Sequence, residues 1–246
     1  MTPPAQTPQR VRLNRARVLD AAVALADEIG IEALSMRRLA QELGVVPMAL
    51  YKHVADKEDL LDGMVEVIVR EIDPPAAGTD WKTTIRRRVL SARHTFQRHR
   101  WARHAIETRT TQTPAVLDYM ESFIGTFLAA GFSADLTHHV MHAIGGRMWG
   151  FTQELFDRSA APDAAASAAV PAETRTAMLA QMAQIYPNIV TIATSTPHDD
   201  ETVVGHGCDD EFEFRFALDL MLDGIERLYE RHWNSAEAKL AIDGGT

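Results

Sequence analysis

Tyr51, Lys52 and His53 follow one another in the chain, and a second lysine stands at Lys57. A phenol, an ammonium group and an imidazole can each donate a hydrogen bond to a phosphate oxygen. Just before them, Met48 offers an apolar group that could meet a thymine methyl. Residue types in this order indicate a surface that binds a nucleic-acid backbone and touches base edges.

The elements around these residues are two short segments of helical pattern separated by a glycine. Ser35 is suited to cap the first, and Gly44 closes it. Pro47 suits the first turn of the second helix, because its missing N–H would be unpaired there. The pattern predicts a helix-turn-helix over residues 35–54, with the second helix in the major groove. From the turn alone, an ordinary corner between two helices is the alternative.

A helix on either side completes a small helical head. Asn14 is suited to cap the first helix and Gly30 to end it, and Asp56 is suited to cap a fourth that runs to Asp73. Four arginines lie within residues 10–17. They indicate either a basic arm on DNA or a disordered tail.

The stretch LSMRRLAQELGVVPMALYKHVADKEDLLDGM resembles the DNA-binding head of the tetracycline-repressor (TetR) family. The resemblance implies that Lys57 meets a phosphate at the start of the fourth helix. It also implies a DNA-facing surface made of eight residues. They are Arg37, Pro47, Met48, Ala49, Tyr51, Lys52, His53 and Lys57.

The stretches LAAGFS, AIGGRMWGFTQE and FEFRFALDLMLDGIERL resemble the C-terminal domain of the tetracycline-repressor branch. The implied fold is all-α, with a disordered tail over 1–12, a DNA-binding domain over 13–72 and an effector-binding and dimerisation domain over 80–235. Gly145, Gly146 and Gly150 would allow close helix approach in a homodimer. Such a dimer would bind a two-fold operator on double-stranded DNA.

The C-terminal domain is expected to enclose a small-molecule effector. The candidate contacts are His104, Arg109, Tyr119, Phe123, His142 and Trp149. The magnesium–tetracycline site of the family does not carry over, because Glu107 and Gly146 stand where its histidines would be. We therefore expect a different, more apolar effector, with no metal and no cofactor.

Composition sets further bounds on the function. The formal net charge is −9, yet residues 1–60 hold eight basic and eight acidic residues, so the acidic excess lies beyond the head. The sequence contains no apolar run long enough to cross a membrane and no secretory signal. Its single cysteine fits a reducing cytoplasm.

Three alternatives to an effector-released repressor remain open on sequence alone. An activator or a ligand-independent regulator could share the fold, and a helical interaction protein could use the head to bind protein. An all-α enzyme is the third, but no nucleophile elbow, phosphate loop or paired-carboxylate motif supports it. Two stretches outside the resemblance are interpreted as a solvated acidic His/Asp loop at 197–211, without zinc-like spacing, and a mobile Ala/Pro-rich connection at 159–175.

Overall fold

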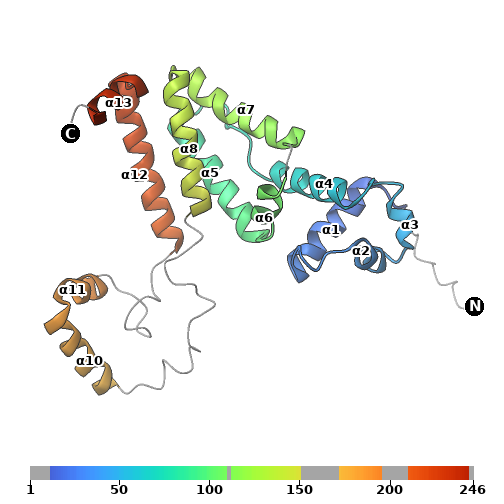
Figure 1. Ribbon diagram of the computed structural model, residues 1–246, viewed down its shortest axis with the longest axis horizontal. Coiled ribbons are helices and arrows are strands. Elements are labelled where there is room, and N and C mark those ends of the chain that lie inside the picture. Colours follow the sequence, from blue (N-terminus) through green and yellow to red (C-terminus); the bar gives the residue numbers. More distant parts are fainter. Residues whose placement is uncertain (1–11, 110–111, 151–171, 196–209, 244–246) are drawn as a thin grey trace, which may run out of the picture. The chain divides into compact units, whose positions relative to one another are not determined.

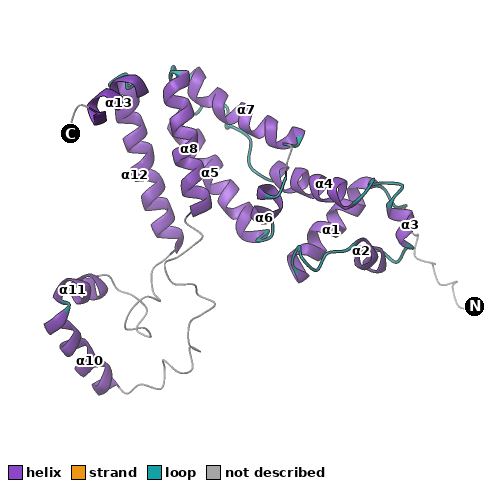
Figure 2. Cartoon of the chain, viewed as in Figure 1, coloured by secondary structure: helices purple, strands orange, loops and turns teal. Residues whose placement is uncertain are grey.

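A computed structural model describes residues 12–109, 112–150, 172–195 and 210–243 of the chain (Figure 1). Within these ranges every regular element is a helix and none is a strand, as the all-α prediction requires (Figure 2). The helices are α1 (Arg15–Ile29), α2 (Met36–Glu42), α3 (Pro47–Leu50), α4 (Lys57–Arg70), α5 (Trp81–Arg98), α6 (Ala102–Glu107), α7 (Pro114–Ala129), α8 (Ala134–Gly150), α10 (Ala172–Ile185), α11 (Pro187–Ser195), α12 (Asp210–Glu230) and α13 (Ser235–Asp243).

The chain divides into two compact units, Met1–His138 and His139–Thr246. The first unit contains α1 to α7, and therefore the helical head together with the helices that follow it. This division does not test the predicted domain boundary between residues 72 and 80, which stays a prediction.

Side-chain caps fix the helix starts in the head, as the sequence predicts. The side chains of Asn14, Ser35 and Asp56 accept hydrogen bonds from backbone N–H groups in the first turns of α1, α2 and α4. Each bond satisfies a donor that the helix itself leaves unpaired. The cap positions are therefore local properties of the sequence.

Helix α4 lies at the centre of the first unit, where α1, α5, α6 and α7 all contact it. Its buried residues include Leu60, Met64 and Ile68, which repeat at intervals of four and so share one face. The core that they join extends from α1 to Trp101 and Ala115. One continuous core thus links the head to the start of the following helices.

Aromatic packing orders the region where α5 meets α7. Trp81 lies 4.9 Å from Phe132 and 5.7 Å from Phe127, measured between ring centroids. Phe132 donates its N–H to the Phe127 carbonyl, and Gly131 between them has φ 92°. This is a Schellman end with its apolar contact, and it closes α7 at Gly131.

In the second unit, α12 buries one face and exposes the other. Phe214, Leu218, Leu222 and Ile225 are buried, and Arg147 on α8 lies over the Phe214 ring at 5.6 Å. The stretch FEFRFALDLMLDGIERL, which resembles the C-terminal domain of the tetracycline-repressor branch, is therefore helical throughout. The sequence interpretation missed α11, α13 and most of α10. It was wrong about residues 172–175, which begin α10, while 159–171 and 197–209 lie outside the described residues.

Among the described helices, none has the length and apolar character needed to cross a membrane.

Candidate nucleic-acid interface and ligand site

Two backbone hydrogen bonds close the tight turn between α2 and α3. The N–H of Val45 reaches the Ala40 carbonyl at 2.9 Å, and the N–H of Gly44 reaches the Gln41 carbonyl at 3.1 Å. Gly44 has φ 64°, a conformation that glycine adopts without steric cost. This pair of bonds is a Schellman motif, so α2 ends sharply and α3 starts at a fixed angle to it. Leu39, Ala40 and Leu50 are buried beneath the turn.

Helix α3 is shorter than the sequence interpretation assumed. It ends at Leu50, and Tyr51 to His53 form a turn. The Leu50 carbonyl accepts the N–H of His53 at 2.8 Å and the N–H of the following Val54 at 3.0 Å. The prediction that Tyr51, Lys52 and His53 continue the helix is therefore wrong. Buried Val54 draws the chain back toward the core at this point.

The residues of this turn still present a polar and apolar surface to solvent. Met48 is 71% exposed and Tyr51 is 45% exposed, and Lys52 is exposed beside them. Ala49 and His53 are half-buried, and Pro47 is exposed. Val46, at 68% exposure, belongs to the same surface and was missed. The sequence signal for Val46 was its position directly before Pro47, where the second helix was predicted to begin.

The other two sequence-predicted contacts lie on the neighbouring helices. Arg37 is exposed in the first turn of α2. Lys57 is exposed as the first residue of α4, next to the capping Asp56. A helix N-terminus with free N–H groups favours an anion such as phosphate. These positions stay candidates for contacts with the DNA backbone.

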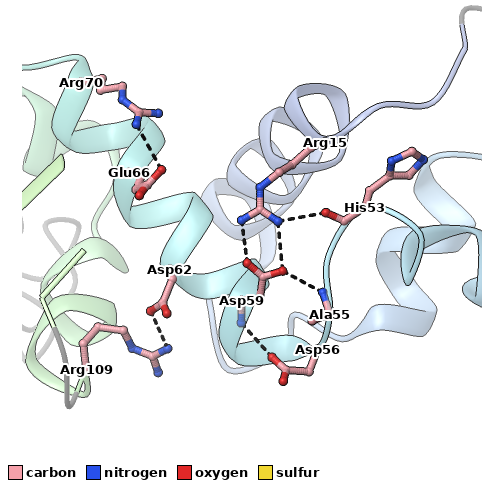
Figure 3. A network of polar contacts seen from close by, with 9 residues as sticks. All are labelled: Arg15, His53, Ala55, Asp56, Asp59, Asp62, Glu66, Arg70 and Arg109. Carbon is pink, nitrogen blue, oxygen red and sulfur yellow. Dashed lines mark hydrogen bonds and ion pairs between the residues drawn. The ribbon is translucent and has the colours of Figure 1, made fainter. Parts of the chain in front are cut away.

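A network centred on Asp59 holds the turn after α3 in place (Figure 3). From α1, Arg15 donates to the His53 carbonyl at 2.9 Å and to both Asp59 carboxylate oxygens at 2.6 and 3.0 Å. Asp59 also accepts the N–H of Ala55 at 2.7 Å. Arg15 thus bridges α1, α4 and the turn. It thereby holds the backbone next to the exposed Tyr51 and Lys52 in place.

The same network shifts the acidity of its central carboxyl. The hydrogen bond from Arg15 holds the pKa of Asp59 below its usual value, and the N–H of Ala55 adds to this effect. Both groups favour the charged form, which outweighs the opposite effect of burial. Asp59 is 33% exposed, so the pair contributes only about 0.5–1 kcal/mol.

A second set of ion pairs joins α4 to the segment after α6. Arg109 contacts Glu58 at 2.7 Å and Asp62 at 3.2 Å, and its side chain is 11% exposed. Figure 3 shows Arg109 reaching Asp62 from the neighbouring element. Arg109 was expected to line an effector site. In the structure its charge is used to tie the end of α6 to the start of α4.

His99, at the C-cap of α5, connects three parts of the first unit. Its Nδ1 lies 2.9 Å from Asp27 of α1, and its Nε2 lies 3.1 Å from Glu71 at the end of α4. Asp27 also accepts the indole N–H of Trp101 at 2.7 Å. Burial would raise the pKa of Glu71, but the hydrogen bonds from Arg98 and His99 hold it below its usual value. No sequence motif pointed to this connection.

The structure brings together two of the six effector candidates. Tyr119 and Phe123 are neighbours on α7, with ring centroids 5.9 Å apart. From α5, the guanidinium of Arg88 lies 4.5 Å from the Tyr119 ring centroid and 5.6 Å from that of Phe123. Sequence reasoning missed Arg88 because it ends the run Arg86-Arg87-Arg88. Its spacing of three and four from Ile85 and Ala92 was the signal that it faces inward.

The other candidates do not join this group. His104 is exposed on α6, and Arg109 makes the ion pairs with α4. His142 is exposed on α8 in the second unit, and the side chain of Trp149 lies outside the described residues. Within the described ranges, no group of three or more His, Cys, Asp or Glu side chains could hold a metal ion.

Two family models match the chain. One, for bacterial regulatory proteins of the tetR family, matches residues 18–64 and so contains the helix-turn-helix. The other, for the tetracyclin repressor-like C-terminal domain, matches residues 74–229, more than half of the sequence. The chain belongs to the TetR family. As a member of that family it is a DNA-binding transcriptional regulator, so the resemblance seen in its sequence is confirmed.

Individual TetR relatives agree with this assignment. The class D tetracycline repressor of Escherichia coli is 36% identical over 164 residues, which cover 62% of this chain and 74% of that protein. A possible TetR-family regulator from Streptomyces coelicolor A3(2) has 28% identity and a TM-score of 0.60, covering 87% of this chain and all of that one. The actinorhodin complex of ActR from Streptomyces coelicolor shares the fold, with 24% identity, a TM-score of 0.64, and coverage of 87% and 96%.

Proposed function

We propose that this TetR-family regulator is a repressor that binds a pseudo-palindromic operator as a homodimer and leaves it when a small molecule binds. The observation that carries the DNA-binding part is the exposed surface of Met48, Tyr51 and Lys52 after a Schellman-closed turn. Phosphate contacts from Tyr51, Lys52 and Lys57 position the head, and Met48 and Ala49 meet base edges.

The dimer is supported by an apolar stripe on α12. Phe212, Phe216 and Leu220 are 61%, 58% and 64% exposed and repeat at intervals of four, so they form one line along the helix. The next position in that line is Gly224, where an added Cβ would meet nothing within 4 Å. Gly145 and Gly146 on α8 are equally open. A second copy that packs on these residues would bury apolar side chains now in water.

Release by a small molecule is supported by the relatives. The class D relative is named for tetracycline, and ActR was crystallised with actinorhodin. In this chain α7 carries the candidate contacts Tyr119 and Phe123, which lie against Arg88 of α5, and α5 ends at the His99 connection to the head. A ligand between α5 and α7 would therefore act on the element that is bonded to α1.

The direct test selects bound fragments from random duplex DNA with the full chain. We expect a sequence with two inverted half-sites whose centres are about 34–36 Å apart, or slightly more. Recovery of single, unpaired half-sites would refute the dimeric operator. Light scattering on the Phe216→Asp variant checks the dimer separately. This variant should be monomeric and should bind the selected DNA much more weakly.

A further inference from the structure

Arg88 is a buried cation without the partner that such a group needs. Arg88 is 3% exposed, and its Nε and Nη1 atoms are buried without a hydrogen bond to any described residue. Burial lowers the pKa of Arg88, and its electrostatic interaction with Tyr119 opposes this effect only in part. An arginine nevertheless stays protonated in proteins. The positive charge is therefore held inside the first unit against the rings of Tyr119 and Phe123, with two of its three nitrogen atoms unpaired.

Aromatic faces compensate this charge in part. The guanidinium lies against Tyr119 and Phe123, an arrangement that attracts a cation to the ring faces. It leaves the N–H donors of Nε and Nη1 without acceptors, and buried unpaired donors are costly. A group with negative charge and acceptor oxygens would both balance the positive charge of Arg88 and pair with these N–H donors. A carboxylate does this, because a guanidinium fork matches it in shape.

The surroundings of Arg88 indicate what carries that carboxylate. Tyr119, Phe123 and Phe127 follow one another along α7 at centroid distances of 5.9 and 5.7 Å. Phe123 and Phe127 are buried and Tyr119 is half-buried, so this row of rings reaches solvent at Tyr119. A further flat ring extends such a row by offset or edge contact. Burial raises the pKa of Tyr119, so its hydroxyl stays neutral and can donate a hydrogen bond.

We propose that Arg88 binds the carboxylate of an aromatic ligand whose ring packs against Tyr119 and Phe123. This inference rests on the proposed effector function and specifies its chemistry. It changes the expectation of a largely apolar effector: the ring system is apolar, and one anionic group is required. Arg88 thereby serves as the determinant that selects aromatic acids over neutral aromatic compounds.

The test compares matched acids and amides on the full chain by calorimetry, without DNA. The probes are benzoate, naphthoate and anthracene carboxylate, each with its neutral carboxamide. We expect at least one acid to bind roughly tenfold or more tightly than its amide, as a charge-assisted hydrogen bond implies. The Arg88→Met variant should lose this preference, and Arg88→Lys should keep part of it. The matched control is Arg87→Met, the same change at an exposed neighbour, which should keep it all.

Melting temperature separates ligand recognition from a structural role of Arg88. Replacing an unpaired buried charge by an apolar side chain should leave the melting temperature unchanged or raise it. A large fall would show that the cation serves the fold and would overturn the proposal. Equal binding of acid and amide, a preference that survives in Arg88→Met, or no binding of any acid would overturn it too. Selection of operator DNA by the same protein remains a separate result, so failure here is distinguishable from failure of the repressor function.

Discussion

At the level of single residues, Lys57 is a cation at the exposed start of a helix. If it meets a phosphate, Lys57→Ala should weaken binding to all operator variants about equally, because phosphate contacts do not read sequence. The slope of log affinity against log salt should become smaller by about 1. The matched control is Lys239→Ala on α13, another exposed lysine. An unchanged salt slope in Lys57→Ala would contradict the assignment.

Met48 should behave in the opposite way. It is exposed on α3, and its apolar end suits a thymine methyl group. We expect Met48→Gln to change which base is preferred at one position of each half-site, by about 1–3 kcal/mol, with an unchanged salt slope. Repeating the DNA selection with the variant measures this. Uniform weakening without a change in base preference would show that Met48 only positions the head.

Asp59 gives a prediction about pH. Its pKa is lower in the folded state, so its stabilising effect is present above the unfolded value of about 4 and is lost as pH falls through the folded value. Asp59→Asn should therefore reduce stability at neutral pH by about 0.5–1.5 kcal/mol and should lose less stability on acidification than the wild type. Denaturant titrations at several pH values test this. Asp20→Asn, at an exposed site on α1, should behave like the wild type.

At the level of elements, alanine substitutions of two helical glycines can distinguish the effect of packing on stability from the effect of helix propensity. A Cβ added at Gly63 of α4 would lie 2.6 Å from Cδ2 of the buried Leu19 on α1, whereas at Gly125 of α7 it would meet nothing within 4 Å. Gly125→Ala should stabilise by about 0.5–1 kcal/mol. Gly63→Ala gains the same propensity but forces α1 and α4 apart, so it should be about 1–3 kcal/mol less stable than Gly125→Ala. Equal thermal stabilities would show that Leu19 moves aside freely.

The elements also show which features could be predicted from sequence. The caps at Asn14, Ser35 and Asp56 and the glycine ends at Gly30 and Gly44 depend on nearby residues, and each is where the sequence predicts it. The end of α3 depends on where buried Val54 packs. That is a tertiary effect, and the pattern around Tyr51 gave no sign of it.

The candidate site follows the same rule. Most of the exposed surface of α3 and the turn after it could be predicted because a short motif contains it, although Val46 was missed. Arg88 and His99 could not, since their roles depend on partners far along the chain. Arg88 contacts Tyr119, and His99 contacts Asp27 across 72 positions. In sequence, the spacing of Arg88 shows only that it faces inward, and His99 looks like an ordinary member of a basic helix.

At the level of the whole molecule, α5 offers a route from a ligand to the DNA-binding head. Arg88 lies 11 positions before His99, or about 16 Å along the helix at 1.5 Å per residue. His99 in turn is bonded to Asp27 of α1 and to Glu71 after α4. A ligand that shifts α5 would therefore strain bonds that fix α1, and the recognition surface would move relative to its operator.

This route predicts a coupling that a single substitution weakens. With a bound aromatic acid, operator affinity should fall roughly 5–150-fold, and the operator should weaken acid binding by the same factor, because coupling is reciprocal. His99→Ala removes the bonds to Asp27 and Glu71, so the factor should approach one while the protein still binds acid and operator separately. His99→Gln, which can keep one of these bonds, should give an intermediate factor. Titrations of the ligand with and without operator measure this coupling factor for the wild type and for both His99 variants. If His99→Ala showed the wild-type factor, the His99 bonds would not carry the signal, and the Arg109 pairs with α4 would be the next connection to test.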